Sequence, residues 1–296
     1  MKNPTTKSFQ SVGIFLAITL ALSSIFYFLI IRSGMTSGGF GTYATGIMWC
    51  PGISALITMW ILKRDIKELG WGWGKTRYQV WSFVIPILYA LIAYVIIWVS
   101  GWGGFYNKDF AKQISESIGL GQLPDGINIT LYVILIGIFG TIRSVANALG
   151  EEIGWRGFLV PELYKTLGYT KTSILSGLIW SVWHLPLLLF ADYNLGTPSW
   201  YAMICFAVLI ISISFILTWF RIKSNSLWTA TLLHASHNRF IQDVFTPLTQ
   251  DTGSTNYYID EFGIVIPIVC IGFAVYFWSR RKELNFMINK TTPDEM

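Results

Sequence analysis

Two adjacent carboxylates stand in a chain that is otherwise rich in apolar residues. Glu151 and Glu152 begin the sequence Glu-Glu-Ile-Gly-Trp-Arg, which ends at Arg156. Neighbouring helix positions point about 100° apart, so the two carboxylates cannot face the same direction. Arg156 follows Glu152 by four residues, on the same helix face, where the two charges can pair. We predict that Glu151 faces a cavity while Glu152 and Arg156 form a pair that fixes the helix. The alternative is a solvated helix end that carries all three charges.

The only three histidines of the chain lie in apolar segments. His234 and Asn238 are four residues apart on one helix face, where both side chains can bind one oxygen atom. His237 points elsewhere and is interpreted as a bystander or supporting group. Structural alternatives exist, because His184 can bond a backbone carbonyl and a His–Asn pair can join two helices. Ionisable groups in membrane helices are costly and usually mark a functional site. Together these residues predict buried acid–base or metal chemistry.

The composition indicates a polytopic membrane protein. Of 296 residues, 53% are hydrophobic and 12% are charged, whereas soluble domains carry about 25% charged residues. The net charge of +5 is distributed by loop, so we expect no nucleic-acid partner. Cys50, Cys205 and Cys270 have no paired spacing and are expected to be buried thiols rather than disulfides or metal ligands.

We predict one all-α membrane domain over residues 1–296, with a motif-bearing catalytic core at about 130–245. The chain has room for about eight spans of ~20 apolar residues. The first apolar segment is longer than a signal-peptide core of about 7–15 residues and is expected to be an uncleaved anchor. The expected spans are 10–31, 42–62, 80–99, 129–150, 172–191, 200–220, 227–243 and 262–279.

The charged loops predict the orientation of these spans. With both termini inside, only three Lys and Arg residues lie in outer loops: Arg32, Lys108 and Lys112. The inner loops then hold fifteen: Lys2, Lys7, Lys63, Arg64, Lys67, Lys75, Arg77, Lys165, Lys171, Arg221, Lys223, Arg280, Arg281, Lys282 and Lys290. The positive-inside rule therefore favours an N-in, C-in topology.

Two outer loops are long enough to carry structure of their own. Loop 100–128 contains Phe110, Ile114 and Ile118 at a spacing of four. This spacing favours either a short helix on the membrane surface or a structured loop on the bundle. Loop 244–261 contains acidic residues but no Lys or Arg, and we interpret it only as an outer loop.

Three motifs in this order resemble the CAAX protease and bacteriocin-processing (CPBP, or Abi) family of intramembrane proteases. This family is related to the type II CAAX prenyl endopeptidase. The motifs are Glu151-Glu152-x-x-x-Arg156, Trp180-x-x-x-His184 and His234-x-x-x-Asn238. Trp180 stands where the family usually has phenylalanine, and His237 is an extra histidine inside the last motif.

The resemblance implies an intramembrane endopeptidase whose polar cavity opens to the cytoplasm or into the bilayer. Glu151 and His184 would activate the attacking water, and His234 and Asn238 would stabilise the oxyanion. Glu152 and Arg156 would support them. Glu151, His184 and His234 are also possible zinc ligands, since three protein ligands and a water make a catalytic zinc site. The His-Glu-x-x-His zinc signature is absent, so a zinc site and a metal-free mechanism both stay open, with the metal-free one favoured.

The implied partners are a peptide or membrane-protein substrate and the lipid bilayer, and the expected location is a bacterial plasma membrane. Relatives act on prenylated tails, peptide precursors or signalling proteins, or protect against bacteriocins, and no residue selects among these roles. One alternative is a proton-coupled transporter, in which Glu and His form a relay. Another is a non-catalytic immunity or scaffold protein of the same fold. Arg143, in the fourth span, has no assigned role.

Overall fold

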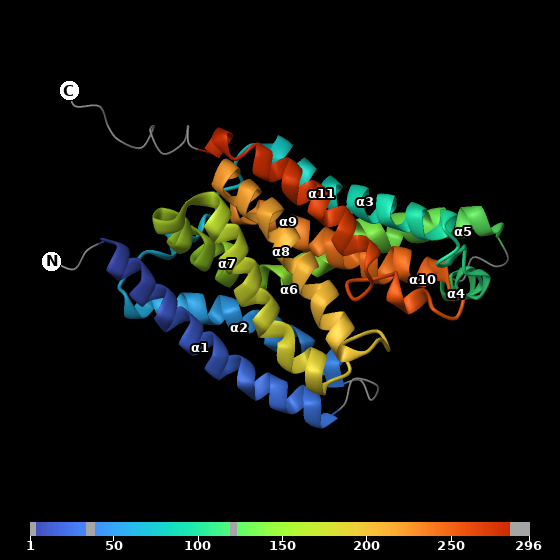
Figure 1. Cartoon of the computed structure of the whole chain (residues 1–296), viewed down its shortest axis with the longest axis horizontal. Helices are drawn as coiled ribbons and strands as arrows, with labels where there is room; N and C mark the ends of the chain where they lie inside the picture. Colours follow the sequence, from blue (N-terminus) through green and yellow to red (C-terminus); the bar gives the residue numbers. More distant parts are fainter. Residues whose placement is uncertain (1–3, 34–38, 119–122, 285–296) are drawn as a thin grey trace.

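The computed structural model describes residues 4–33, 39–118 and 123–284 (Figure 1). This part of the chain is a bundle of helices, as predicted. Its α-helices are α1 Pro4–Ser33, α2 Gly39–Ile61, α3 Thr76–Val99, α4 Lys108–Ile118, α5 Asp125–Tyr132, α6 Gly140–Glu152, α7 Val160–Phe190, α8 Ser199–Ser224, α9 Leu227–Asn238, α10 Thr246–Leu248 and α11 Val265–Ser279. Two 3-10 turns, η1 Ile66–Leu69 and η5 Thr255–Tyr257, and one antiparallel pair of two-residue strands, β1 Gly104–Phe105 and β2 Thr249–Gln250, complete these ranges.

Three π-helical segments interrupt the α-helices: η2 Val133–Phe139, η3 Ile153–Leu159 and η4 Arg239–Phe245. Two of them directly follow the motif residues Glu152 and Asn238. A π-turn widens the helix, shifts the residues beyond it around the axis and is frequent at functional sites. The π-turns change the helical spacing after α6 and α9, although Glu152 at the end of α6 still pairs with Arg156 in η3.

The longest helical run extends from Asp125 to Phe190 and contains a break at Gly168. Gly168 has φ +66° and ψ −179°, a conformation that glycine adopts at little cost. A Cβ at Gly168 would meet no atom within 4 Å, so the backbone conformation, and not space, calls for glycine. The break separates the part of the run that carries Glu151 from the part that carries His184.

Among the described residues, five helices are long and apolar enough to cross a membrane: Ser8–Ser33, Tyr43–Ile61, Thr76–Val99, Asp125–Phe190 and Ser199–Ser224. The fourth has 66 residues and includes the break at Gly168, whereas one span needs about 20. Each of the eight segments expected to span is helical over most of its length in the described ranges. The number of crossings and the N-in, C-in orientation stay predictions. Lys2 and Lys290, which entered the charge count, lie outside the described residues, as does the side chain of Lys7.

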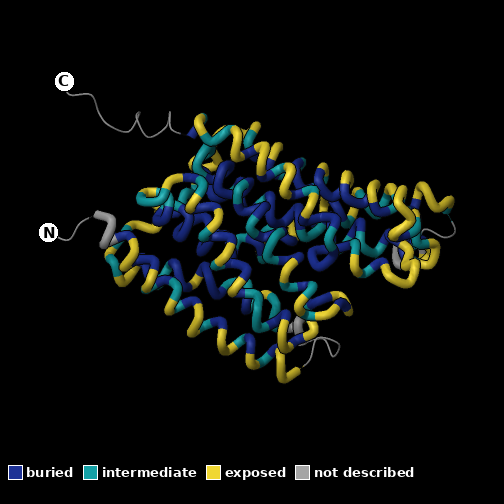
Figure 2. The backbone as a smooth tube through the Cα atoms, in the orientation of Figure 1, coloured by how far each residue is buried: buried dark blue, intermediate teal, exposed yellow. Residues whose placement is uncertain are grey.

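Burial follows the pattern of a bundle that faces lipid. Helix α7 packs on α8, α1 on α2, and α9 on both α3 and α6. Buried residues run along the middle of the bundle, while exposed ones lie on its outer faces (Figure 2). Large apolar side chains such as Phe28, Trp60 and Val99 are exposed. In a membrane, such side chains contact lipid tails.

Glycines let α2 approach the helix that carries the two carboxylates. A Cβ at Gly52 would lie 2.4 Å from the carbonyl oxygen of Gly150, and one at Gly154 would lie 2.5 Å from Cβ of Pro51. Neither contact leaves room for a side chain. Backbone therefore packs against backbone on both sides of Glu151 and Glu152. This close packing fixes the position of the two carboxylates along the axis of the bundle.

The two outer loops fold against each other. Loop 100–128 does form a helix, α4, with Ala111 and Ile114 buried. The ring of Phe110 meets that of Tyr132 edge to face, with centroids 5.2 Å apart. The helix thus packs on the bundle, and the side chain of Ile118 lies outside the described residues. Strand β1 pairs with β2, which ties this loop to the segment after α10.

Candidate active site

A buried cavity of about 100 Å³ lies among α2, α6, α7, α8 and α9. All four residues predicted to be catalytic line it: Glu151, His184, His234 and Asn238. Glu152 and Arg156 are fully buried beside it. Tertiary packing therefore brings together residues that lie up to 87 positions apart in the sequence.

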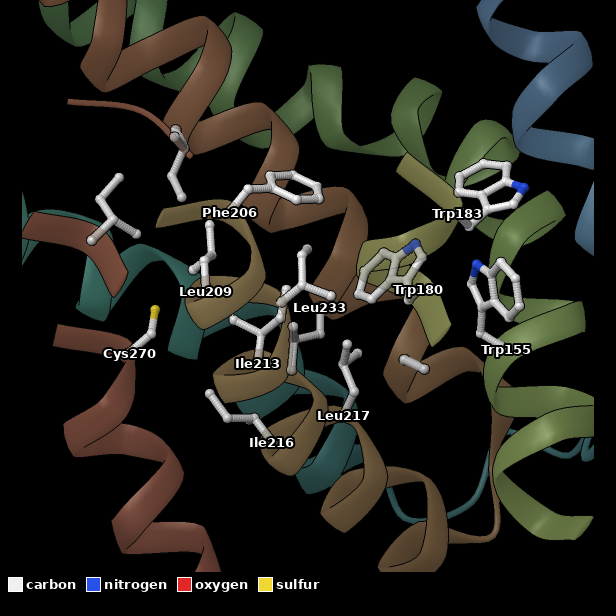
Figure 3. Packing of buried hydrophobic residues seen from close by; sticks show 14 of the residues in the cluster. Trp155, Trp180, Trp183, Phe206, Leu209, Ile213, Ile216, Leu217, Leu233 and Cys270 are labelled. Carbon is white, nitrogen blue, oxygen red and sulfur yellow. The ribbon is translucent and has the colours of Figure 1, made fainter. Parts of the chain in front are cut away.

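Glu151 is held by two indole groups. Its Oε2 accepts hydrogen bonds from Nε1 of Trp180 at 2.9 Å and Nε1 of Trp155 at 3.3 Å. In Figure 3 the two indole nitrogens face each other across the gap between the rings. Glu151 is 3% exposed, and its hydrogen-bond partners among the described residues are neutral indoles. Trp180 thus gives this chain a hydrogen bond that the phenylalanine usual at this position cannot form.

Glu152 is shared between an arginine and a histidine. Its Oε1 accepts from Nη1 of Arg156 at 2.9 Å and from Nδ1 of His234 at 2.9 Å. The predicted Glu152–Arg156 pair is therefore confirmed, and both side chains have 0% exposure. Because the carboxylate can only accept, Nδ1 of His234 carries a proton and Nε2 is the nitrogen left for the cavity. A protonated ring, which Glu152 would stabilise, presents Nε2–H as a donor.

Arg156 has further contacts that hold the pair in place. Its Nη2 donates to Oγ of Ser214 at 3.2 Å, and its guanidinium lies 4.1 Å from the centroid of the Trp180 ring. Cation–π contacts of this kind are strongest where water is excluded. The ring of Trp180 thus touches Arg156 while its nitrogen bonds Glu151, which links the two carboxylates of the motif through one side chain.

His184 is oriented by its own helix. Its Nδ1 donates to the backbone carbonyl of Trp180 at 3.0 Å. This is the structural contact expected of a lone histidine, yet it also fixes the tautomer, since Nε2 of the neutral ring then keeps its lone pair. The ring lies between Trp183 and Phe206, with centroids 4.8 Å from each. His184 can therefore accept a proton on the nitrogen that has no partner within the described residues.

Asn238 has an uncommitted amide. It lines the cavity one turn after His234, and its side chain makes no hydrogen bond to another described residue. Both groups belong to α9, as their spacing predicts. Two potential donors on one helix face are therefore directed at one small space.

His237 faces the same cavity rather than pointing elsewhere, and loop 244–261 is more than an outer loop. His237 lines the same cavity, with Nε2 at 2.9 Å from Oε1 of Glu261 and Nδ1 at 2.6 Å from the hydroxyl of Tyr89. Nε2 of Gln242 also donates to Oε1 of Glu261, at 3.2 Å. Glu261 comes from the segment between α10 and α11 and lines the cavity itself. The adjacent carboxylates Asp260 and Glu261, placed directly before an apolar span, were the signal that could have pointed to it.

Asp260 and Glu261 share one buried environment but differ in protonation. Burial and the neighbouring Glu261 raise the pKa of Asp260 to about 7. Burial alone would raise the pKa of Glu261, but the hydrogen bond and charge of His237 lower it. Asp260 accepts from Oγ1 of Thr246 at 2.9 Å and from the backbone N–H of Glu261 at 2.6 Å. Near neutral pH the proton is therefore held mainly by Asp260, and Glu261 is the charged member.

The cavity lies beneath loops that the charge pattern assigns to the outside. Tyr193, from the α7–α8 loop, and Glu261 both line it. Tyr193 packs its ring edge to face on Phe262, with centroids 4.9 Å apart. Two of the loops assigned to the outside therefore contribute to the cavity, and its opening to the cytoplasm or into the bilayer stays a prediction.

The arrangement does not match a preformed metal site. Glu151, His184 and His234 have donor types that suit zinc. Within residues 4–33, 39–118 and 123–284, however, no three His, Cys, Asp or Glu side chains are grouped closely enough to hold one ion. Oε2 of Glu151 already accepts two indole N–H groups. We assign no step to a metal.

Cys50, Cys205 and Cys270 are buried free thiols, and Arg143 is exposed and does not line the cavity.

The sequence model of the family described as Type II CAAX prenyl endopeptidase Rce1-like matches residues 130–240. The matched segment carries all three motifs and is similar to that family. A curated relative, CAAX prenyl protease 2 of Methanococcus maripaludis, is 34% identical over 107 residues. That similarity covers 34% of this chain and 38% of the relative, so it spans well under half of the relative's length. Tyr89 and Glu261 lie outside the segment that matches the CAAX protease family.

Proposed function

We propose that this chain is an intramembrane endopeptidase of the CAAX protease type. The observation that carries the proposal is the convergence of Glu151, His184, His234 and Asn238 on one buried cavity. The first two present proton acceptors, and the last two present hydrogen-bond donors. Peptide hydrolysis needs both kinds of group around one carbonyl carbon.

In the proposed mechanism a water molecule lies between Glu151 and His184. Glu151 takes a proton from this water as the water oxygen attacks the peptide carbonyl carbon. Nε2 of His184 accepts a hydrogen bond from the second hydrogen of the water and orients the molecule. The carbonyl oxygen becomes an oxyanion, and the proton held by Glu151 passes to the leaving nitrogen as the C–N bond breaks. Positioned general bases contribute about 10²–10⁴-fold to such steps.

His234 and Asn238 would stabilise the oxyanion. The ring of His234 donates from Nε2 when it is protonated, and Glu152 at 2.9 Å from Nδ1 favours that form. The amide of Asn238 supplies a second donor. One such donor lowers the activation barrier by about 3–4 kcal/mol. Glu152 and Arg156 then act as positioning residues, which agrees with their complete burial.

The substrate would be a peptide or membrane protein that reaches the cavity from the bilayer. The name of the relative points to prenylated proteins, and we propose these as the candidate substrate class of the present chain. A cavity of about 100 Å³ is smaller than the roughly 300–1,000 Å³ of ordinary ligand pockets. A peptide substrate would therefore need more room than this cavity has in the structure.

The test compares new protein termini in cells that express wild type or Glu151→Gln at equal levels. The matched control is Glu68→Gln, because Glu68 is exposed, pairs with Arg64 at 2.6 Å and does not line the cavity. Termini that appear with wild type and Glu68→Gln but not with Glu151→Gln would support proteolysis and name the substrate. If no termini depend on Glu151, the proposal fails. Proton flux into dye-loaded proteoliposomes that depends on Glu151 would then favour a transporter, and an unchanged cellular phenotype in Glu151→Gln would favour a scaffold.

A further inference from the structure

A second, larger groove lies on the side of the bundle between α3, α8 and α11. Its volume is about 870 Å³, and it shares no lining residue with the catalytic cavity. Its walls are apolar and open to the surroundings: Leu88 and Ile92 on α3 and Ile268 on α11 are all exposed. An apolar groove on the outside of a membrane bundle faces lipid rather than water.

One end of this groove is basic. Arg77, Lys223 and Arg280 line it, and Glu283 is the one carboxylate among the lining residues that the structure describes. Glu283 pairs with Arg280 at 2.6 Å and lies 3.5 Å from Lys223. Three cationic side chains against one carboxylate leave an excess of positive charge, which an anion would balance.

The dimensions of the groove fit one leaflet. Arg77 and Ile92 are fifteen residues apart on α3, which is about 22 Å at ~1.5 Å per residue. Half of a hydrocarbon core is about 15 Å thick. The apolar wall is therefore long enough for one acyl chain, with the cations at the level of the headgroup. The same end carries the basic loops, which the positive-inside rule assigns to the cytoplasmic leaflet, where anionic lipids are enriched.

We propose that this groove binds an anionic phospholipid of the cytoplasmic leaflet. The phosphate would lie against Arg77, Lys223 and Arg280, and an acyl chain would lie between α3 and α11. The site is separate from the proposed catalytic cavity and does not depend on the proposed activity.

Gly272 offers a direct way to close the groove. It lines the groove on α11, and a Cβ there would meet no atom within 4 Å. The side chain in Gly272→Leu should therefore project into the groove, and leucine has a higher helix propensity than glycine. Gly13 on α1 is the matched control, because it also has no atom within 4 Å of a Cβ and does not line the groove.

The experiment uses the purified full-length protein in neutral detergent, with dioleoyl phosphatidylglycerol and dioleoyl phosphatidylcholine as probes. Native mass spectrometry measures bound lipid, and thermal unfolding measures stabilisation. We expect retention of phosphatidylglycerol over phosphatidylcholine, a loss of at least about tenfold in affinity in Arg77→Gln/Lys223→Gln, and loss of the bound lipid in Gly272→Leu. Gly13→Leu and Arg281→Gln should bind as wild type does, and inorganic phosphate should not compete.

Three results would overturn the proposal. The first is equal binding of the two lipids, which would remove the role of the cations. The second is unchanged phosphatidylglycerol binding in both groove variants, which would place the lipid elsewhere. The third is a dimer in wild type that Gly272→Leu converts to a monomer, which would make the groove an interface with a second copy of the chain.

Discussion

The shared carboxylate of Glu152 leads to a quantitative prediction. Oε1 of Glu152 accepts from both Arg156 and His234 at 2.9 Å, and Glu152 and Arg156 have no solvent exposure. In Glu152→Gln the amide keeps its shape and can still accept one hydrogen bond, but the buried cation Arg156 loses the carboxylate that it contacts directly. Removal of one member of a buried ion pair costs about 3–5 kcal/mol. At about 2–4 °C per kcal/mol for a chain of this size, Tm should fall by about 6–20 °C.

The chain contains a matched control for this substitution. Arg64 and Glu68 form another i,i+4 pair, at 2.6 Å, but Glu68 is 46% exposed. Exposed pairs contribute about 0–1 kcal/mol, so Glu68→Gln should change Tm by no more than a few degrees. The double variant Glu152→Gln/Arg156→Gln should be more stable than Glu152→Gln alone, because it removes the unpaired cation.

The assay is thermal unfolding of the purified proteins in one detergent, followed by tryptophan fluorescence. Equal Tm values for Glu152→Gln and Glu68→Gln would refute the reasoning, since burial would then make no difference to the two pairs. A double variant less stable than Glu152→Gln would also contradict it. In that case hydrogen bonding, rather than charge balance, would account for the stability of the site.

Three further outcomes follow from single contacts. Trp180→Phe removes the 2.9 Å hydrogen bond to Glu151. Because hydrogen bonds to charged groups contribute about 1.5–3 kcal/mol, kcat/KM should fall by about tenfold or more while the variant protein accumulates to the wild-type level. Gly154→Ala places a Cβ 2.5 Å from Pro51, so unfolding measurements should show a loss of about 1–3 kcal/mol, whereas Gly13→Ala should show none. The pKa of Asp260 is about 7 in the fold, against an ordinary value of 3.8. The folded state therefore favours protonated Asp260, and this contribution to stability is complete below about pH 4 and is lost as pH rises through about 7. Asp260→Asn should therefore reduce the fall in Tm between pH 5 and pH 8.

Local spacing predicted the contacts that a single helix can make. Arg156 is four residues after Glu152, and the structure has their side chains at 2.9 Å. His234 and Asn238 are likewise on one face of α9 and line one cavity. The long apolar segments predicted an all-α bundle, because only helices satisfy their backbone within such a segment.

Residue spacing along the sequence did not predict the contacts between distant segments. Glu152 meets His234 across 82 positions, and Trp180 meets Glu151 across 29. Neither follows from spacing, since both depend on how α6, α7 and α9 pack. Glu261 escaped prediction for a different reason: it lies in a loop whose acidic residues are typical of a solvated surface, and only the fold places it in the cavity.

The most direct test of the account measures hydrolysis by the purified protein in proteoliposomes. The substrate is a synthetic peptide that spans the junction identified from the cellular termini, and kcat/KM is compared for wild type, Glu151→Gln and Arg143→Gln. Arg143 belongs to the same helix but is exposed and outside the cavity. We predict a loss of at least about 100-fold for Glu151→Gln and no loss for Arg143→Gln, at equal Tm. A Glu151→Gln protein that cleaves within tenfold of wild type would contradict the central claim that Glu151 activates the attacking water.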